Sequence, residues 1–523
     1  MRRKQKRVPN LAQGMLPIAL ETSHVEQPKK RGGSRFQDDR PEHLRIGAQR
    51  LDEYLTAGGL GWVIRLRREL EQIDFTALVT GYDMMGRRPY HPRTIVGLIV
   101  YGMLCRQWSL RELEVLAVRD MGAWWICGGL QPDHSTIGDF IHRHRSVLTE
   151  EFFVALVAGL VGRAKLPAGV VAGDGTVVQA ATSQHRVLTV EAARAAAECA
   201  RVNAAEQPAD AAAQARAAQA QEVAALAQQR VERRHAAKLR AIATPCVAPS
   251  EPTAVVQRSK NGTHLPSYKP TTLVHESGLI VAQQVHPSSE TATVNALLDQ
   301  HTGAFGVEPT TALFDAGFHS GELLQHVAER GIDILCPPGK PTGTWRKRNG
   351  PRRGLDKAAF TYDALANVYH CPASQVLRSV AAGIDRAGRA YQSYGGAPCR
   401  QCALRAQCTT SATGREVIRY AGDEFKECMA EVLQQPAARK QFRRRRSIVE
   451  RPFAELRYRQ GLTRFHRRGI LGVRVEFALH CIAFNLKWAI SYERGVFIVV
   501  VRVLAPQPDA NGTLVAVVLR FPA

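Results

Sequence analysis

The fold is decided by two short stretches, Val170-Val171-Ala172-Gly173-Asp174-Gly175-Thr176 and Ala312-Leu313-Phe314-Asp315-Ala316-Gly317-Phe318. In each stretch a carboxylate follows a short apolar run, and a glycine comes one or two residues later. This pattern predicts an acidic side chain at the tip of a buried β-strand. A third acid, Glu450, lies in a helical pattern behind the run Arg443-Arg444-Arg445-Arg446. Three carboxylates beside concentrated positive charge suit the binding of divalent metals against a phosphodiester.

The sequence around these stretches predicts an α/β region. Strands are expected at residues 170–172, 271–275, 279–282, 312–314 and 332–335. Glu276-Ser277-Gly278 joins the second and third of them as a hairpin turn. Helices are expected from about residue 294, and after Ser320, which caps a helix that Gly331 stops. The predicted order is therefore strand, hairpin, helix, strand, helix, strand.

The region before this core, residues 46–165, reads as a helical domain. Ser109-Leu110-Arg111-Glu112 has the pattern of a capping box, and Asp133 opens another helix that ends near Arg143 and Arg145. Short helices with a basic last member resemble helix-turn-helix architecture, which binds DNA. A helical packing domain explains the same pattern equally well.

The other segments read as an arm, two insertions and a tail. Residues 1–45 are basic and weakly periodic, which predicts a disordered arm. An Ala-rich insertion at about 185–260 predicts a helical hairpin broken near Gln207-Pro208. A second insertion, residues 341–420, is rich in Gly, Arg and Cys and is expected to be irregular. Residues 424–492 return to helix, and 493–523 read as a weak hairpin or an unpacked tail.

The composition indicates an anionic partner. The 523 residues include 70 Lys and Arg against 47 Asp and Glu, so the net charge is +23 and the pI about 9.9. Double-stranded DNA fits this charge. A membrane fits it less well, because no apolar run reaches the roughly 18 residues that span a bilayer. The basic N-terminus lacks the apolar stretch of a signal peptide, so we expect a cytoplasmic protein whose 11 cysteines are not paired in disulfides.

The segment around Glu450 predicts an amphipathic helix with a functional face. Arg443, Arg446, Glu450 and Arg457 recur at steps of three, four and seven residues and should share that face. Arginine suits phosphate through its fixed fork of donors. Pro452 should kink or restart the helix. In the alternative interpretation, the two Asp-Gly stretches are ordinary turns and Glu450 pairs with Arg446.

With these three acids in this order, the chain resembles a DDE transposase of the bacterial insertion-sequence type, most similar to the insertion-sequence 1182 group. Asp174 and Asp315 match the first two acids of that family. Residues 443–457 match its signature Tyr-x2-Arg-x3-Glu-x6-Lys, with Glu450 as the third acid. Arg443 stands where the family has Tyr, and Arg457 where it has Lys. The resemblance covers residues 80 to 490.

This resemblance implies an α/β fold with a ribonuclease-H-like (retroviral-integrase-type) catalytic core at residues 166–492, carrying the helical and Cys-containing insertions behind an N-terminal all-α domain. It implies two Mg²⁺ or Mn²⁺ ions held by Asp174, Asp315 and Glu450. The expected phosphate-binding arginines are Arg143, Arg145, Arg443, Arg446 and Arg457.

Four cysteines, Cys371, Cys399, Cys402 and Cys408, lie close together in the second insertion. Cys399-x2-Cys402 has the spacing of a zinc knuckle, and the other two cysteines would complete a four-thiolate Zn²⁺ site. A set of reduced, partly buried thiols in a loop is the alternative.

The function that these observations predict is that of a transposase. The protein would bind the terminal inverted repeats of its element, act as a homodimer on DNA at the nucleoid, and cleave and join strands with metal ions. A catalytically decayed, transposase-derived DNA-binding protein is the alternative. Inverted repeats flanking the reading frame would separate the two.

Overall fold

The computed structural model describes residues 35–492, apart from residues 81, 83–87, 237–245, 260–261, 340–354, 356, 386–387 and 397. The chain divides into two units. One contains residues up to 144 together with those from 486 onward, and the other contains residues 145–485. Residues 1–34 of the predicted arm and the predicted tail 493–523 lie outside the described residues.

The first unit is built from helices. Its described elements include a short hairpin, β1 (Arg45–Ile46) with β2 (Gln49–Arg50), and the helices α1 (Leu51–Ala57), α2 (Gly61–Glu71), α3 (Thr76–Val79), α4 (Pro92–Leu104), α5 (Leu110–Arg119), α6 (Met121–Cys127) and α7 (His134–Arg143). The predicted caps are present. Ser109 and Glu112 form a capping box at the start of α5, and the Asp133 side chain accepts a hydrogen bond from Thr136 N at the start of α7.

The end of the predicted arm is not disordered but packed into the helical unit. Phe36 and Asp39 are buried. The Asp39 carboxylate accepts hydrogen bonds from Arg93 Nη2 (2.7 and 2.9 Å), Arg67 Nη2 (3.2 Å) and Thr94 Oγ1 (3.0 Å). The arm boundary at residue 45 was therefore placed too late, because a buried carboxylate can recruit distant arginines that local periodicity does not reveal.

The second unit is organised around a mixed sheet. Its strands are β3 (Val170–Gly175), β4 (Val178–Gln179), β5 (Val255–Arg258), β6 (His264–His275), β7 (Ile280–His286), β8 (Thr311–Leu313) and β9 (Asp333–Leu335). The long strand β6 runs antiparallel to β3 on one side and to β7 on the other. Strands β3, β8 and β9 are parallel to one another. The predicted order of strand, hairpin, helix, strand, helix, strand is confirmed.

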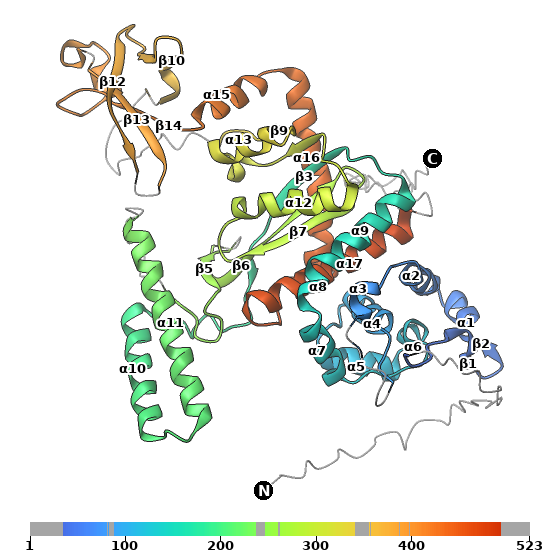
Figure 1. Ribbon diagram of the computed structural model, residues 1–523. Helices are drawn as coiled ribbons and strands as arrows, with labels where there is room; N and C mark the ends of the chain where they lie inside the picture. The colour runs from blue at the N-terminus through green and yellow to red at the C-terminus, as the bar shows by residue number, and fades with distance from the viewer. Residues whose placement is uncertain are drawn as a thin grey trace, which may run out of the picture. The chain divides into compact units, whose positions relative to one another are not determined.

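Helices cover this sheet (Figure 1). Helices α9 (Glu151–Ala164) and α12 (Val294–Phe305) pack against β7 and against each other, and α16 (Pro436–Ala454) packs against β3 and β6. Helix α13 (Gly321–Glu329) begins at its predicted cap, Ser320. Because α9 packs on the sheet, the boundary between the units falls after residue 144 and not at the predicted 165. The short helix α8 (Arg145–Thr149) also belongs to this unit.

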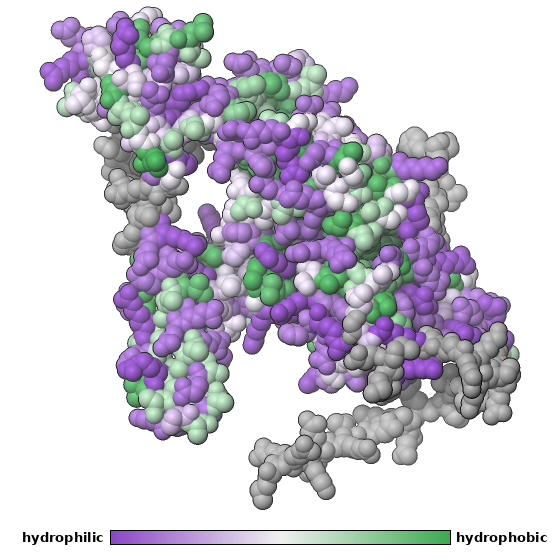
Figure 2. Space-filling model, viewed as in Figure 1, coloured by the Kyte–Doolittle hydropathy of each residue, from purple (hydrophilic) through white to green (hydrophobic). Residues whose placement is uncertain are grey.

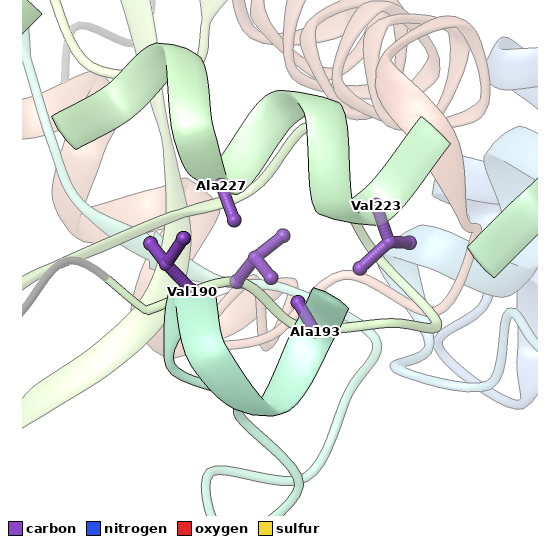
Figure 3. Packing of buried hydrophobic residues seen from close by; sticks show 5 residues of the cluster. Val190, Ala193, Val223 and Ala227 are labelled. Atoms are coloured by element: carbon purple, nitrogen blue, oxygen red, sulfur yellow. The ribbon is translucent and has the colours of Figure 1, made fainter. Parts of the chain in front are cut away.

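The Ala-rich insertion forms the predicted hairpin of two helices, α10 (Val190–Glu206) and α11 (Ala211–Ala236). At its base Val190, Ala193, Val223 and Ala227 pack together with Val247 (Figure 3). The small alanine side chains let the helices approach closely. The hairpin surface mixes pale green and purple (Figure 2), as alternating alanine and charged residues require.

The Cys-containing insertion is not irregular, which corrects the prediction. It contains a five-stranded antiparallel sheet of β10 (Thr361–Asp363), β11 (Val368–His370), β12 (Val376–Ile384), β13 (Ala390–Gly395) and β14 (Val417–Tyr420). In β12 only Leu377 is buried, and Val380 and Ile384 are exposed. A strand that is exposed on both faces lacks the alternation of apolar and polar residues that reveals strands in a sequence.

The C-terminal helices of the described chain are α15 (Asp423–Val432), α16 and α17 (Gly469–Tyr492). Pro452 does not end α16, which continues to Ala454 and then widens into a π-helix at Glu455–Arg459. Helix α17 is long and apolar enough to cross a membrane, contrary to the expectation that no run has this length. However, 72% of its apolar window is buried inside the protein, as in the core helix of a soluble domain.

We expect Asp39→Ala to lower the free energy of unfolding by about 3 kcal/mol or more, because it removes the buried carboxylate that Arg67 and Arg93 share and leaves the buried Arg67 with Glu71 as its remaining carboxylate partner. Denaturant unfolding followed by tryptophan fluorescence will measure this, since four of the six tryptophans lie between residues 62 and 125. Asp38→Ala is the control, because Asp38 forms an exposed ion pair with Arg40 and its loss should change stability by less than about 0.5 kcal/mol.

The contribution of Asp39 should also depend on pH. Burial acts to raise the pKa of Asp39, but hydrogen bonding by Arg93 and the charges of Arg67 and Arg93 hold it below the usual value. A carboxylate with a depressed pKa in the folded state stabilises the protein above its unfolded pKa of about 4, and this stability is lost as the pH falls. Equal effects of Asp39→Ala at pH 7 and at pH 3 would contradict the assignment.

Candidate active site

The parallel strands β3 and β8 bring the first two acids together. Their register pairs Ala172 with Leu313. Asp174 and Asp315 each lie two residues beyond this pair, at the same edge of the sheet. The Asp174 Oδ1 atom accepts a hydrogen bond from Gly175 N (3.0 Å), and Asp315 Oδ1 accepts one from Gly317 N (2.8 Å). The predicted convergence of these two carboxylates is thus present.

Arg445 of α16 joins the two carboxylates. Its Nη2 atom lies 3.0 Å from Asp174 Oδ1 and 3.6 Å from Asp315 Oδ2. The same nitrogen donates to Gly173 O at 3.0 Å, and Nε lies 3.3 Å from that oxygen. The Arg445 side chain is 14% exposed. A single guanidinium therefore contacts oxygens of both strands.

The Asp174 side chain is partly buried and lies near other carboxylates. Burial raises the pKa of the Asp174 carboxyl, although the neighbouring Arg445 charge acts to lower it. Asp315 and Glu290 contribute negative charge that also raises this pKa. Glu290 lies beside Gly175 and forms an ion pair with Lys269 at 3.4 Å. The site thus favours a bound cation, since its carboxylates repel one another.

Glu450, the third acid of the predicted cluster, pairs with Arg446, and its convergence with Asp174 and Asp315 stays a prediction. Its side chain is 59% exposed and accepts a hydrogen bond from Arg446 Nε at 2.7 Å, as in the alternative interpretation of the sequence. With 100° of rotation per residue, Glu450 lies about 140° around α16 from Arg445, whereas Val449 and Pro452 lie close to the Arg445 direction. Because Val449 and Pro452 are buried, the helix turns Glu450 outward.

The predicted phosphate-binding arginines divide between two environments. Arg443 and Arg446 are exposed on the outward face of α16. Arg457 is half-buried and its Nη2 donates to Thr176 Oγ1 and to Val177 O (2.9 Å). The π-helix that contains Arg457 changes the rotation per residue, so Arg457 turns toward the end of β3 instead of remaining on the predicted common face.

The two other arginines, Arg143 and Arg145, are exposed. Arg143 is in the last turn of α7 and lies over the Tyr82 ring at 5.4 Å. Arg145 begins α8. Both side chains can therefore reach a phosphate from solvent, and nothing in the structure assigns them to one.

The four cysteines of the second insertion line one small pocket together with Phe360 and Leu377. Cys371 Sγ accepts a hydrogen bond from Gln375 N (3.3 Å), and Cys399 Sγ accepts one from Arg415 N (3.4 Å). Burial raises the pKa of the Cys408 thiol, and the charges of Cys399, Cys371 and Cys402 raise it further. All four are free thiols.

The two aspartates and the four cysteines differ in how well they suit a metal ion. Within the described part of the chain, no group of three or more His, Cys, Asp or Glu side chains is arranged to hold a metal ion. The predicted tetrahedral zinc site of the four cysteines therefore stays a prediction. Asp174 and Asp315 supply hard oxygen donors, which Mg²⁺ prefers and of which it uses one or two per ion. This pair suits a divalent ion by its chemistry.

The sequence analysis missed two residues of this site, Arg445 and Glu290. Arg445 was hidden in a run of four arginines, and its distinguishing signal is its position four residues before the apolar Val449, on the buried face of the helix. Glu290 follows β7 in a turn without a motif of its own, and its proximity to Asp174 depends on how β7 lies in the sheet.

Two segments of the chain match family models. Residues 370–489 match a family described as "Transposase DDE domain", and residues 62–143 match one described as "Transposase domain (DUF772)". The first segment contains α16 with Arg445 and Glu450, and the second contains the helices α2 to α7. No curated protein matches the chain. The family of the first segment also implies a ribonuclease-H-like fold, in agreement with the strand order described above.

Gly173 should be required for the spacing of the two acids. A Cβ atom at this position would lie 2.2 Å from the ring of the fully buried Phe314, which precedes Asp315. We expect Gly173→Ala to lower the free energy of unfolding by about 1–3 kcal/mol through overpacking. Urea unfolding will measure it.

Gly162→Ala is the matched control, since a Cβ there meets nothing within 4 Å and the residue lies in the last turn of α9. It should stabilise the protein by about 0.5–1 kcal/mol, the usual gain from replacing a helical glycine. Equal stability changes in the two variants would refute the packing argument at Gly173.

Proposed function

We propose that this chain, a transposase of the DDE type, binds the terminal inverted repeats of an insertion sequence of the insertion-sequence 1182 group and catalyses metal-dependent DNA cleavage and strand transfer. The observation that carries this proposal is the meeting of Asp174 and Asp315 at the ends of two parallel strands, beside an arginine-rich helix. Paired carboxylates beside arginines suit phosphoryl transfer, which depends on positioning and electrostatic stabilisation.

The residues have distinct roles in the proposed reaction. Asp174 and Asp315 would hold Mg²⁺ or Mn²⁺, which supplies Lewis-acid activation of water and of the reacting phosphate. Glu450 would complete the metal site when DNA separates it from Arg446. Arg446 and Arg457 would bind phosphate oxygens and keep the scissile bond in line. Hydrolysis would break the bond between a 3′-oxygen and phosphorus and liberate a 3′-hydroxyl. That hydroxyl would then attack a target phosphate, forming a new P–O bond and expelling the 3′-oxygen of the target strand as the leaving group.

The charge of the chain supports DNA as the partner. A net charge of +23 favours a polyanion through release of counterions. Arg143, Arg145 and Arg443 are exposed and would contact phosphates, which positions DNA without reading its sequence. We propose that the helices α2 to α7 recognise the element ends and that two copies act together on them. Action on chromosomal DNA places the protein in the bacterial cytoplasm, at the nucleoid.

A catalytically decayed DNA-binding protein is the second candidate. The observation that favours it is the ion pair of Glu450 with Arg446 on the exposed side of α16, together with Arg443 and Arg457 at positions where the resembled family has Tyr and Lys. This protein would bind the same DNA but would not cleave it.

Asp315→Ala separates the two candidates. We expect it to abolish Mg²⁺-dependent nicking of a duplex that carries the element end, while binding of that duplex changes less than about threefold, because affinity resides mainly in the arginines. Gel-based cleavage and fluorescence anisotropy measure the two quantities.

Asp333→Ala is the control, since Asp333 is exposed and lies at the opposite end of the neighbouring strand β9. It removes the same charge and should retain cleavage. If the unaltered protein binds the element end but does not nick it with Mg²⁺ or Mn²⁺, the decayed protein is the correct assignment.

We also propose that Cys371, Cys399, Cys402 and Cys408 hold a structural Zn²⁺. The support is that all four line one pocket, and that backbone N–H groups donate to two of the sulfurs. Bound zinc would anchor the turns of the β10–β14 insertion, whose small core consists of Phe360, Tyr369, Leu377, Tyr394 and Val417.

Metal analysis of the reduced protein should find about one zinc per chain, since four thiolates satisfy one tetrahedral ion. Cys402→Ser should lose most of that zinc, whereas Cys199→Ser, which alters an exposed thiol on the helical hairpin, should retain it. Absence of zinc from protein purified under reducing conditions would refute the proposal.

A further inference from the structure

Each member of the run Arg443-Arg444-Arg445-Arg446 has a different environment. Arg446 pairs with Glu450, Arg444 pairs with Glu276, and Arg443 is exposed. Arg445 alone in this run contacts the acids at the strand ends. Four identical side chains are thus given separate roles by the rotation of the helix.

The guanidinium of Arg445 lies between the carboxylates of Asp174 and Asp315, whose negative charges require a cation. Its Nη2 atom has three oxygens around it, from Asp174, Asp315 and Gly173, at 3.0 to 3.6 Å. The oxygens come from two strands and from one backbone carbonyl. They are the oxygens that the proposed function assigns to a divalent ion, apart from the carbonyl.

We infer that Arg445 and the divalent ion compete for Asp174 and Asp315, so that Arg445 acts as a positioning residue that admits metal only when its own charge finds another partner. This inference rests on the proposed function, because it assumes that these two acids bind the metal. An ion that takes these oxygens at about 2.1 Å is repelled by a guanidinium that contacts the same oxygens, since both are cations. Metal entry therefore requires the Arg445 head group to move.

The direction of that movement is limited by the helix. Arg445 lies in line with Val449 and Pro452, which are buried, so its stem stays at the sheet while its head group can leave the acids. A DNA phosphate at the site would supply the anion that the displaced guanidinium needs, through two parallel hydrogen bonds. Binding of DNA and binding of metal should therefore strengthen each other.

The test is a titration of full-length protein with Mn²⁺, followed by electron paramagnetic resonance, in the absence of DNA. Arg445→Met keeps the length of the side chain and removes its charge, and it should bind Mn²⁺ about tenfold or more tightly than the unaltered protein. Arg451→Met removes the same charge from an exposed position of the same helix and should leave the affinity within about twofold of the unaltered protein. Equal or weaker binding by Arg445→Met overturns the inference.

A second measurement tests whether DNA binding increases the affinity for Mn²⁺. A short duplex without element sequence should tighten Mn²⁺ binding by the unaltered protein, and it should do so less in Arg445→Met. If the gain is the same in both proteins, Arg445 does not link the two ligands and the inference fails. Should Arg445→Met not fold, Arg445→Lys decides. A lysine side chain is shorter than that of arginine and lacks its planar fork, so it should hold the two acids and Gly173 O less firmly. Mn²⁺ affinity should therefore still rise, and no rise overturns the inference.

Asp315→Asn distinguishes failure of this inference from failure of the proposed function. If it weakens Mn²⁺ binding but Arg445→Met does not strengthen binding, only the role of Arg445 is wrong. If Asp315→Asn leaves Mn²⁺ binding unchanged, the two acids do not form the metal site, and the proposed function fails with the inference.

Discussion

Two carboxylates that end adjacent parallel strands repel each other, and the structure around them supplies the positive charge that this repulsion requires. Asp174 is partly buried, so its charged form loses hydration as well. The guanidinium of Arg445 offsets both effects, and a single arginine is in contact with the two acids. For this contact to exist, α16 must lie against β3, and its apolar residues Val449 and Pro452 must face the sheet. The electrostatics of the acids and the packing of the helix therefore depend on each other.

The glycines on either side of Asp174 belong to the same arrangement. Gly173 leaves space for the Phe314 ring, and Gly175 leaves space for the Glu290 side chain. A larger residue at position 173 would clash with the Phe314 ring that precedes Asp315, so Gly173 sets how closely the two acid-bearing strands approach. Gly173 and Phe314 are therefore densely packed within the sheet. The charged side chains gather just beyond the strand ends, where a phosphate and metal ions would bind.

The two insertions extend this core in different ways. The helical hairpin α10–α11 is held by small apolar side chains at its base and has a mixed, largely polar surface (Figure 2). The β10–β14 insertion has a small aromatic core beside its four cysteines. It leads directly into α15, whose start approaches α13 so closely that Gly321 and Gly422 meet backbone to backbone. Because α13 follows Asp315, this contact connects the insertion with the strand end that carries the second acid.

The sequence by itself determined the elements whose signals are local. The strand ends at Asp174 and Asp315, the caps at Ser109, Asp133 and Ser320, and the break in the Ala-rich hairpin all arise from neighbouring residues, because capping, turns and amphipathic periodicity act over a few positions. The transposase resemblance also came from the sequence, since it depends on three acids in a fixed order.

Tertiary structure decided what depends on contacts between distant residues. It selected Arg445 from four adjacent arginines, paired Glu450 with Arg446 on the exposed side of α16, and buried Asp39 within the helical unit. It also formed a sheet from the β10–β14 segments, whose exposed faces carry no alternating pattern. In each case the outcome depends on rotation or pairing against a partner far along the chain, and local sequence does not encode that partner.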